Sequence, residues 1–206
     1  KENPTLNLIY LPHLDYCLQQ FGPDAPEVVP ELHAIDELVG DLINFYQQRD
    51  IEVVLLSEYG ISKVNRAIHI NREFRKQGWI QVKDELGLET LDCGACRAFA
   101  VADHQVAHVY INDASIRDEV HGLLEKMEGV EEIRIPAELW GEGIATERAG
   151  DLIAVAEPDA WFTYYYWDDD AKAPDFARCV DIHRKPGYDP VELFLDPKIR
   201  FPKAKI

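Results

Sequence analysis

The chain has few basic residues, few cysteines and no long apolar run. Among its 206 residues, 21 Lys and Arg stand against 38 Asp and Glu, which gives a formal net charge of −17 at pH 7. A surface this acidic has no basic stripe to displace the counterions of a phosphate backbone, so we expect no binding to nucleic-acid duplexes or anionic membranes. The longest apolar runs, such as 51–56, are strand-sized and far shorter than the ~20 residues of a membrane span.

The four cysteines are too sparse in a chain of this length to form a disulfide scaffold. Cys93 and Cys96 form a CxxC motif, but no second CxxC completes a zinc ribbon. The following segment, 97–103, has a strand pattern, whereas a redox CxxC opens a helix. We therefore interpret the pair as two reduced thiols in or near a turn, which favours a cytoplasmic location.

The first 65 residues predict a parallel crossover. Segment 6–11 is short and apolar and predicts a buried strand, and 51–56 predicts a second one. Between them, the apolar residues of 29–49 recur at helical spacing. Strand, helix and strand in this order form a βαβ unit with parallel strands. We therefore predict an α/β fold with a mainly parallel sheet flanked by helices.

The pattern changes in the middle of the chain. Two pairing strands, an amphipathic helix and a third strand are predicted, in this order, at 97–103, 107–111, 114–126 and 130–135. They indicate a small α+β subdomain over 66–147, inserted into the larger sheet. A strand at 151–156 returns to the core, so 1–65 and 148–206 form the predicted core. The aromatic stretch 161–167 is interpreted as core and lid packing, with stacking on a flat leaving group as the alternative.

Polar side chains follow the predicted strands at three places. His13 and Asp15 follow the first strand, Glu58 and Tyr59 follow the second, and His183 lies in a late polar cluster. Ligands of α/β sheets bind at the carboxyl ends of the strands, and carboxylates with imidazole are donors for divalent metals. Taken singly, a helix cap, a surface carboxylate and a core histidine are the alternatives for Asp15, Glu58 and His183.

In their order and context, these motifs resemble the type I phosphodiesterase/nucleotide pyrophosphatase family of the alkaline phosphatase superfamily. The segment Asp15-x-x-x-Gln19-x-x-Gly-Pro is similar to the family's Asp-x-x-x-His-x-x-Gly-Pro, whose Asp and His bind one metal. Segment 53–61 is similar to a family strand that ends in Ser-Asp-His-Gly-Met, whose Asp and His bind another. His183, followed by Gly-Tyr-Asp at 187–189, resembles the family's late metal-binding His.

The resemblance implies two divalent metal ions, which would be Zn, Mn or Mg. It implies Asp15, Glu58 and His183 as ligands, with Gln19, Tyr59 and His13 as further candidates. The family's His, Asp and His are replaced here by Gln19, Glu58 and Tyr59. Glutamine is a poor zinc ligand, and a tyrosine phenol must first lose a proton with a reference pKa of about 10. The donors therefore shift toward oxygen, which favours Mg or Mn over zinc. On a strand, His13 would share a face with Asp15.

We predict a metal-dependent hydrolase of phosphoric esters, with a phosphodiesterase or nucleotide pyrophosphatase activity on a small phosphorylated substrate. The family's Thr or Ser nucleophile lies upstream of every motif found here, so the chain resembles the second half of a catalytic domain. Lys1 indicates an N-terminus that is processed, trimmed or cut from a longer chain. The nucleophile, the substrate-binding residues and the oligomeric state are left unassigned.

Two alternatives stay open. In the first alternative, suggested by the exchanges at Gln19 and Tyr59, the chain is a non-catalytic, metal-poor relative that binds a small molecule or a protein. In the second alternative, the fold is the same and the reaction is that of a phosphonate hydrolase, sulfatase or phosphomutase, because fold alone does not select the substrate.

Overall fold

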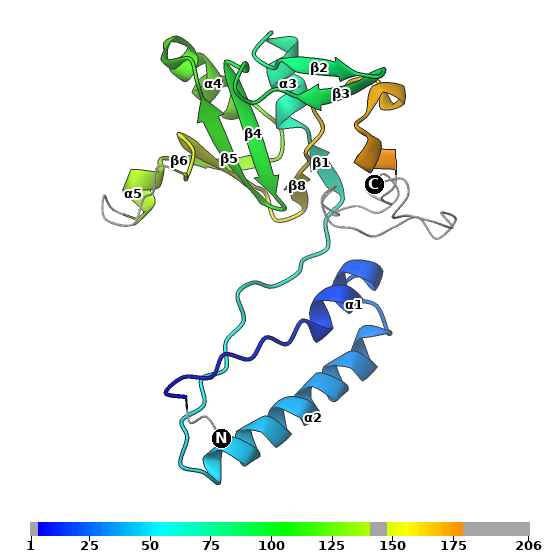
Figure 1. The fold of residues 1–206 in the computed structure, drawn as a ribbon, viewed down its shortest axis with the longest axis vertical. Helices are drawn as coiled ribbons and strands as arrows, with labels where there is room; N and C mark the ends of the chain where they lie inside the picture. Colours follow the sequence, from blue (N-terminus) through cyan, green and yellow to red (C-terminus); the bar gives the residue numbers. More distant parts are fainter. Residues whose placement is uncertain (1–3, 141–147, 179–206) are drawn as a thin grey trace. The chain divides into compact units, whose positions relative to one another are not determined.

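The computed structural model describes residues 4–140 and 148–178, and the chain divides into two compact units, 1–63 and 64–206 (Figure 1). Each unit has its own architecture. Within the described residues, no helix is both long enough and apolar enough to cross a membrane.

The first unit contains two helices, α1 (His13–Phe21) and α2 (Val28–Gln47), which pack against each other. Gly22 ends α1 with a φ of 87°, a conformation that glycine adopts without strain. Proline in the first turn of α2 loses no helical hydrogen bond, and the helix agrees with the predicted one at 29–49.

The two buried strands predicted for this unit are wrong. Neither 6–11 nor 51–56 is paired in a sheet, so the predicted βαβ crossover is not formed by the described residues. The side chains of Leu8 and Val54 are 88% and 77% exposed. A buried strand needs hydrogen-bonded neighbours and a covered face, and the described part of 1–63 contains no further strand to supply them.

The second unit is built on an antiparallel sheet of four strands in the order β4-β5-β7-β6. These strands are Ala98–Asp103, Val106–Ile111, Leu152–Ala156 and Val130–Arg134. Helices α3 (Ile70–Lys76) and α4 (Arg117–Leu124) contribute to the same apolar core (Figure 1). The strands predicted in the middle of the chain are confirmed, and the predicted helix at 114–126 is α4 preceded by one 3-10 turn at Ala114–Ile116.

Strand β7 occupies a different place from the one predicted. The strand predicted at 151–156 was expected to belong to the core formed by 1–65 and 148–206, but β7 is hydrogen-bonded between β5 and β6 and so lies inside the sheet of the predicted insertion. Gly150 makes this approach possible, because a Cβ there would lie 2.9 Å from the carbonyl oxygen of Val109. A joint core of 1–65 and 148–206 stays a prediction.

Smaller elements complete the unit. Strand β1 (Arg66–Ile68) pairs in parallel with β8 (Ala160–Phe162), and β2 (Val82–Glu85) forms a hairpin with β3 (Leu88–Leu91). Short helical segments are found at Pro136–Trp140, Asp170–Lys172 and Asp175–Arg178. Trp161, Phe162, Tyr166 and Trp167 are buried, which agrees with the packing interpretation of the aromatic stretch.

The edge of β4 is closed by a side chain. Asn71 is buried, donates from Nδ2 to the carbonyl oxygen of Ala100 at 2.8 Å and accepts from the amide of Ala100 at 2.7 Å. The asparagine amide therefore replaces one peptide group of a neighbouring strand. It satisfies a backbone donor and acceptor that would otherwise stay unpaired at the sheet edge.

Candidate functional site

The structure brings together three of the positions singled out in the first unit. Asp15 and Gln19 lie one turn apart on α1, and Tyr59 comes from the segment after 51–56. Gln19 donates from Nε2 to Asp15 Oδ1 at 3.0 Å, and the Tyr59 hydroxyl donates to the same oxygen at 2.8 Å. One carboxylate oxygen therefore links the two sequence motifs across 44 residues.

The orientation of the Gln19 amide follows from its partner. A carboxylate is an acceptor, so the amide must turn its NH₂ group toward Asp15. Its Oε1 is buried and has no hydrogen-bond partner among residues 4–140 and 148–178. A buried carbonyl oxygen without a partner is costly.

His13 does not join this group. It begins α1, and its Nε2 lies 2.5 Å from Glu31 Oε2 of α2. Because 13–21 is helical and not extended, His13 and Asp15 are separated by about 200° around the helix axis. The premise that the two share a face of a strand is therefore wrong.

Of the two remaining predicted ligands, Glu58 lies among the described residues. Glu58 is exposed to solvent, and Ser57 beside it donates to the carbonyl oxygen of Tyr59 at 2.7 Å. His183 lies outside the described residues. Within residues 4–140 and 148–178, no three His, Cys, Asp or Glu side chains gather as a metal site. The assignment of Asp15, Glu58 and His183 as ligands stays a prediction.

A second polar group lies in the other unit and has no counterpart in the sequence prediction. His69 and Thr163 directly follow the parallel strands β1 and β8, and His69 Nδ1 lies 2.7 Å from Thr163 Oγ1. Tyr165 stacks on the imidazole with ring centroids 5.1 Å apart. Burial, with a smaller contribution from Arg72, lowers the pKa of His69 to about 4, so it is neutral at pH 7. The pair joins the ends of the two strands.

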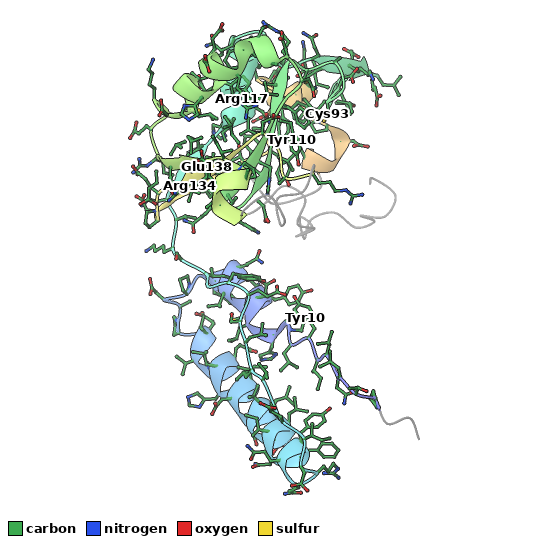
Figure 2. The ribbon with its side chains drawn as sticks, turned by 90° about the vertical axis from the view of Figure 1, so that its left-hand side faces the viewer. Tyr10, Cys93, Tyr110, Arg117, Arg134 and Glu138 are labelled. Carbon is green, nitrogen blue, oxygen red and sulfur yellow. The ribbon has the colours of Figure 1, made fainter. Side chains whose placement is uncertain are left out.

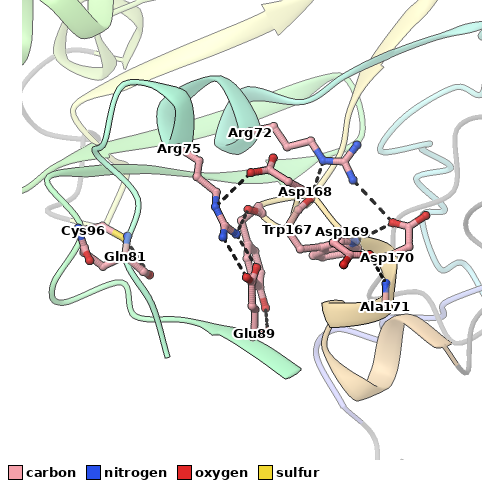
Figure 3. A network of polar contacts seen from close by, with 11 residues as sticks. Arg72, Arg75, Gln81, Glu89, Cys96, Trp167, Asp168, Asp169, Asp170 and Ala171 are labelled. Atoms are coloured by element: carbon pink, nitrogen blue, oxygen red, sulfur yellow. Dashed lines mark hydrogen bonds and ion pairs between the residues drawn. The ribbon is translucent and has the colours of Figure 1, made fainter. Parts of the chain in front are cut away.

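A network of hydrogen bonds and ion pairs lies at the C-terminal end of the aromatic stretch, around Trp167 and Asp168 (Figure 3). Arg75 forms a forked pair with Glu89, at 2.5 Å and 2.9 Å, and contacts Asp168 at 3.3 Å. Arg72 donates from Nε to the carbonyl oxygen of Trp167 at 2.6 Å. The hydrogen bonds from Arg75 lower the pKa of Glu89, which burial alone would raise. These contacts fix the segment around Trp167 to α3 and β3.

The cysteines behave as the sequence predicts. Cys17, Cys93 and Cys96 are free, and Cys93 starts a turn at the surface (Figure 2), while Cys96 is buried behind it. Burial raises the pKa of both thiols of the CxxC motif. A redox-active or metal-binding cysteine requires the opposite shift, because the thiolate is the reactive form. Cys179 lies outside the described residues.

Comparison with protein families gives a match over most of the chain. The family model described as type I phosphodiesterase / nucleotide pyrophosphatase matches residues 1–189. A curated relative is an uncharacterized pyrophosphatase/phosphodiesterase of Schizosaccharomyces pombe, which is 34% identical over 80 residues, or 36% of this chain and 16% of that protein.

One solved structure supports the fold, and a second is reported for its coverage alone. Inactive murine ectonucleotide pyrophosphatase/phosphodiesterase 5 in complex with AMP is 16% identical, with a TM-score of 0.50, and the match covers 88% of this chain and 42% of that one. Phosphonoacetate hydrolase of Sinorhizobium meliloti with phosphonoacetate is 14% identical over 88% of this chain and 40% of that one, with a TM-score of 0.44. The chain spans about two fifths of these proteins. The predicted α/β, alkaline-phosphatase-like fold is confirmed, with β1 and β8 as its parallel pair among the described strands.

Proposed function

The chain belongs to the type I phosphodiesterase/nucleotide pyrophosphatase family, and we propose that it acts as a metal-dependent hydrolase of phosphoric esters. One observation carries the proposal: Gln19 and Tyr59, from the two family motifs, meet on one oxygen of Asp15. The names of the yeast and murine relatives support a phosphodiester or pyrophosphate substrate. The AMP complex of the murine protein supports a nucleotide as the phosphorylated small molecule.

The donors present fit a divalent cation. The carboxylate of Asp15 is a hard oxygen donor, and its Oδ2 takes no part in the two hydrogen bonds that Oδ1 accepts. In the proposed site Asp15 and His183 hold one metal, and Glu58 helps to hold another. A bound cation supplies a Lewis acid for a phosphoryl oxygen and offsets the net charge of −17. Asp15 binds the cation, and Gln19 and Tyr59 orient Asp15 by donating hydrogen bonds to its Oδ1.

Two further expectations belong to this proposal. The three free thiols described support a cytoplasmic location. We also retain the inserted α+β lid subdomain at 66–147 as a prediction.

The test is a charge-removing substitution in the full-length protein. Asp15→Asn is expected to lower bound divalent metal, measured by mass spectrometry after dialysis, and to lower hydrolysis of a nitrophenyl phosphodiester at least 100-fold. Asp24→Asn, at an exposed position after α1, is the matched control and should change neither value. Unchanged metal content in Asp15→Asn would reject the site, and absent hydrolysis with Mg, Mn and Zn alike would reject the enzyme.

One observation favours the second candidate, a metal-poor binding module. Asp15 Oδ1 already accepts two hydrogen bonds, so the family's metal position has the polar partners that a metal-free site would need. This candidate expects no stoichiometric metal and no change in melting temperature when divalent cations are removed and restored. A rise on restoring them would exclude it, because binding to the native state stabilises that state.

A further inference from the structure

The CxxC motif of the second unit lies in a tight turn between β3 and β4, and the proposed function leaves it unused. The amides of Ala95 and Cys96 both donate to the carbonyl oxygen of Asp92, at 3.0 Å and 3.1 Å. These bonds close a single helical turn, in which residues three apart have Cα atoms about 5 Å from each other. This separation lies within the range of about 4.4–6.8 Å that a disulfide requires, so the backbone brings Cys93 and Cys96 to bonding distance.

One side chain from outside the turn holds the backbone of both cysteines. Asn112 directly follows β5, and its Nδ2 donates to the carbonyl oxygens of Cys93 and Cys96, at 2.9 Å and 2.8 Å. A single amide group therefore fixes the two ends of the motif relative to the sheet. Two groups that are held together before they react have a high effective concentration toward each other. Asn112 thus prepares the two thiols for a bond between them.

The two thiols differ in their access to solvent. Cys93 is exposed, whereas Cys96 is 2% exposed and lies beside Gln81 (Figure 3). The Sγ of Cys96 accepts from the amide of Gln81 at 3.2 Å and donates to the carbonyl oxygen of Gln81 at 3.7 Å. That carbonyl also accepts from the amide of Asp92 at 3.0 Å, so the loss of the weak S–H donor leaves it with a partner. A disulfide therefore adds no unpaired polar group to the core.

The charges around the motif make it a poor catalyst and a good disulfide. Burial, with a smaller contribution from the carboxylate of Asp92, raises the pKa of both thiols, and Lys83 of β2 pairs with that carboxylate at 2.8 Å. Neither thiol is a fast nucleophile at pH 7, which argues against a dithiol that catalyses exchange. A dithiol becomes a strong oxidant when its reduced form is stabilised as a thiolate, and here that form is disfavoured. Thiols of high pKa are also slow leaving groups, so the bond is slow to be reduced.

We propose that Cys93 and Cys96 form a reversible intramolecular disulfide, with oxidised glutathione as the oxidant. The Cys93 thiolate attacks one sulfur of oxidised glutathione, and one glutathione leaves as a thiolate that takes up a proton from water. Cys96 then loses its proton and attacks the Sγ of Cys93, which releases the second glutathione. The two protein thiols lose two electrons, and one glutathione disulfide is reduced to two thiols. This inference goes beyond the proposed function and depends neither on a metal nor on hydrolysis.

The experiment is a redox titration of the full-length protein. The protein is reduced with dithiothreitol, freed of it, equilibrated with mixtures of reduced and oxidised glutathione, and quenched by alkylation, and its peptides are identified by mass spectrometry. With both forms of glutathione at about 1 mM, we expect the Cys93–Cys96 disulfide to exceed the dithiol at least about tenfold. Dithiothreitol should restore both thiols. Two alkylated thiols throughout the titration, a lasting glutathione adduct on Cys93, or a disulfide to any other cysteine would overturn the proposal.

Single exchanges of cysteine identify the two partners. Cys93→Ser removes the exposed thiol, and Cys96→Ala keeps a small apolar side chain at the buried position, so both variants should lose the disulfide. Cys179→Ser should be oxidised like the unchanged protein. If Cys96→Ala does not fold, Cys93→Ser decides, because its Cys96 should then be alkylated at every glutathione ratio. Loss of the disulfide in Cys179→Ser would assign the bond to another pair and reject this one.

Asn112 tests the geometry of the turn. Asn112→Ala removes both hydrogen bonds to the cysteine carbonyls, so we expect the ratio of disulfide to dithiol to fall about tenfold. Asn44→Ala, at an exposed position of α2, is the matched control and should leave this ratio unchanged. An unchanged ratio in Asn112→Ala, or an equal decrease in both variants, would contradict the preorganised turn on which the proposal rests.

Discussion

The two units of the chain use their apolar residues in opposite ways. In the second unit, Phe74, Val120 and Trp167 are completely buried in one core. In the first unit most large apolar side chains are exposed, including Leu8 and Val54, and two helices pack with little buried area. The second unit is therefore stabilised by packing. The candidate site of the first unit rests on hydrogen bonds between a helix and a segment that no sheet supports.

The polar contacts of the two units also differ in their exposure to solvent. In the second unit, Glu89 is 8% exposed, and both of its carboxylate oxygens are bound by Arg75. In the first unit, the hydrogen bond from Tyr59 to Asp15 is exposed to solvent. A buried, forked pair is a structural element that fails when one partner is removed, whereas an exposed hydrogen bond adds little stability and stays free to exchange its partner.

The largest expected difference between the units comes from one substitution made in each. Phe74→Ala removes a fully buried ring that packs on Trp79, and we expect a loss of about 4 kcal/mol in the free energy of unfolding. Phe45→Ala, on α2, removes a ring that is 49% exposed, and we expect a loss below about 1 kcal/mol. Urea denaturation measures both values. Equal losses would mean that the first unit has a core of comparable strength.

An arginine in each unit gives the next comparison. Arg75→Ala leaves the carboxylate of Glu89 buried without its cation, so we expect a loss of about 3 kcal/mol, given that Arg75 keeps part of its side chain in solvent. Arg49→Ala removes an exposed hydrogen bond of 2.7 Å to the Phe45 carbonyl and a stacking contact, for which about 0.5 kcal/mol is expected. Urea denaturation of both variants measures these two losses in the free energy of unfolding. A small effect at Arg75 would show that Glu89 finds water or another partner.

His69, in the second unit, should make the stability of the protein depend on pH. Its folded-state pKa of about 4 lies below the ordinary value of about 6.5, so the unfolded chain takes up the proton first as pH falls. The stability that the neutral imidazole contributes is present above pH 6.5 and is lost between about pH 6.5 and 4. Because solvent screens a half-buried group, we expect a loss of about 2 kcal/mol.

His69→Asn isolates this contribution. Asparagine retains a polar contact for Thr163 and does not titrate, so its unfolding free energy should fall less steeply than that of the unchanged protein between pH 7 and 4.5. Carboxylates titrate in both proteins, and the difference between the two curves therefore belongs to His69. Parallel curves would contradict the lowered pKa.

These contrasts also explain which features the sequence could predict. The elements between 97 and 135 agree with their patterns, because the second unit supplies each of them with paired strands or a shared apolar core. Segments 6–11 and 51–56 have the composition of buried strands, but burial depends on neighbouring strands that the described residues do not contain. In the site, the spacing of Asp15 and Gln19 predicts their contact once α1 is recognised as a helix.

Contacts between distant residues had no such local signal. The bond from Tyr59 to Asp15 and the pair of His69 with Thr163 join residues 44 and 94 positions apart. Arg75 and Glu89 are ordinary surface types in the sequence, and it is the packing of the aromatic stretch that buries their pair. The one available sign for His69 and Thr163 was their position directly after β1 and β8, where polar residues gather in α/β folds.

The smallest effect on stability is expected from a charge introduced into the exposed segment 51–56. Val54→Lys places an ammonium group on an apolar segment that is exposed and unpaired, so we expect the free energy of unfolding to change by less than about 0.5 kcal/mol. Unpaired, apolar segments of strand composition invite pairing between chains, and lysine opposes it. Self-association of the 206-residue chain should therefore fall, as measured by sedimentation at several concentrations. Leu86→Lys, on the paired and exposed β2–β3 hairpin, should leave association unchanged, and an equal decrease there would assign the effect to net charge alone.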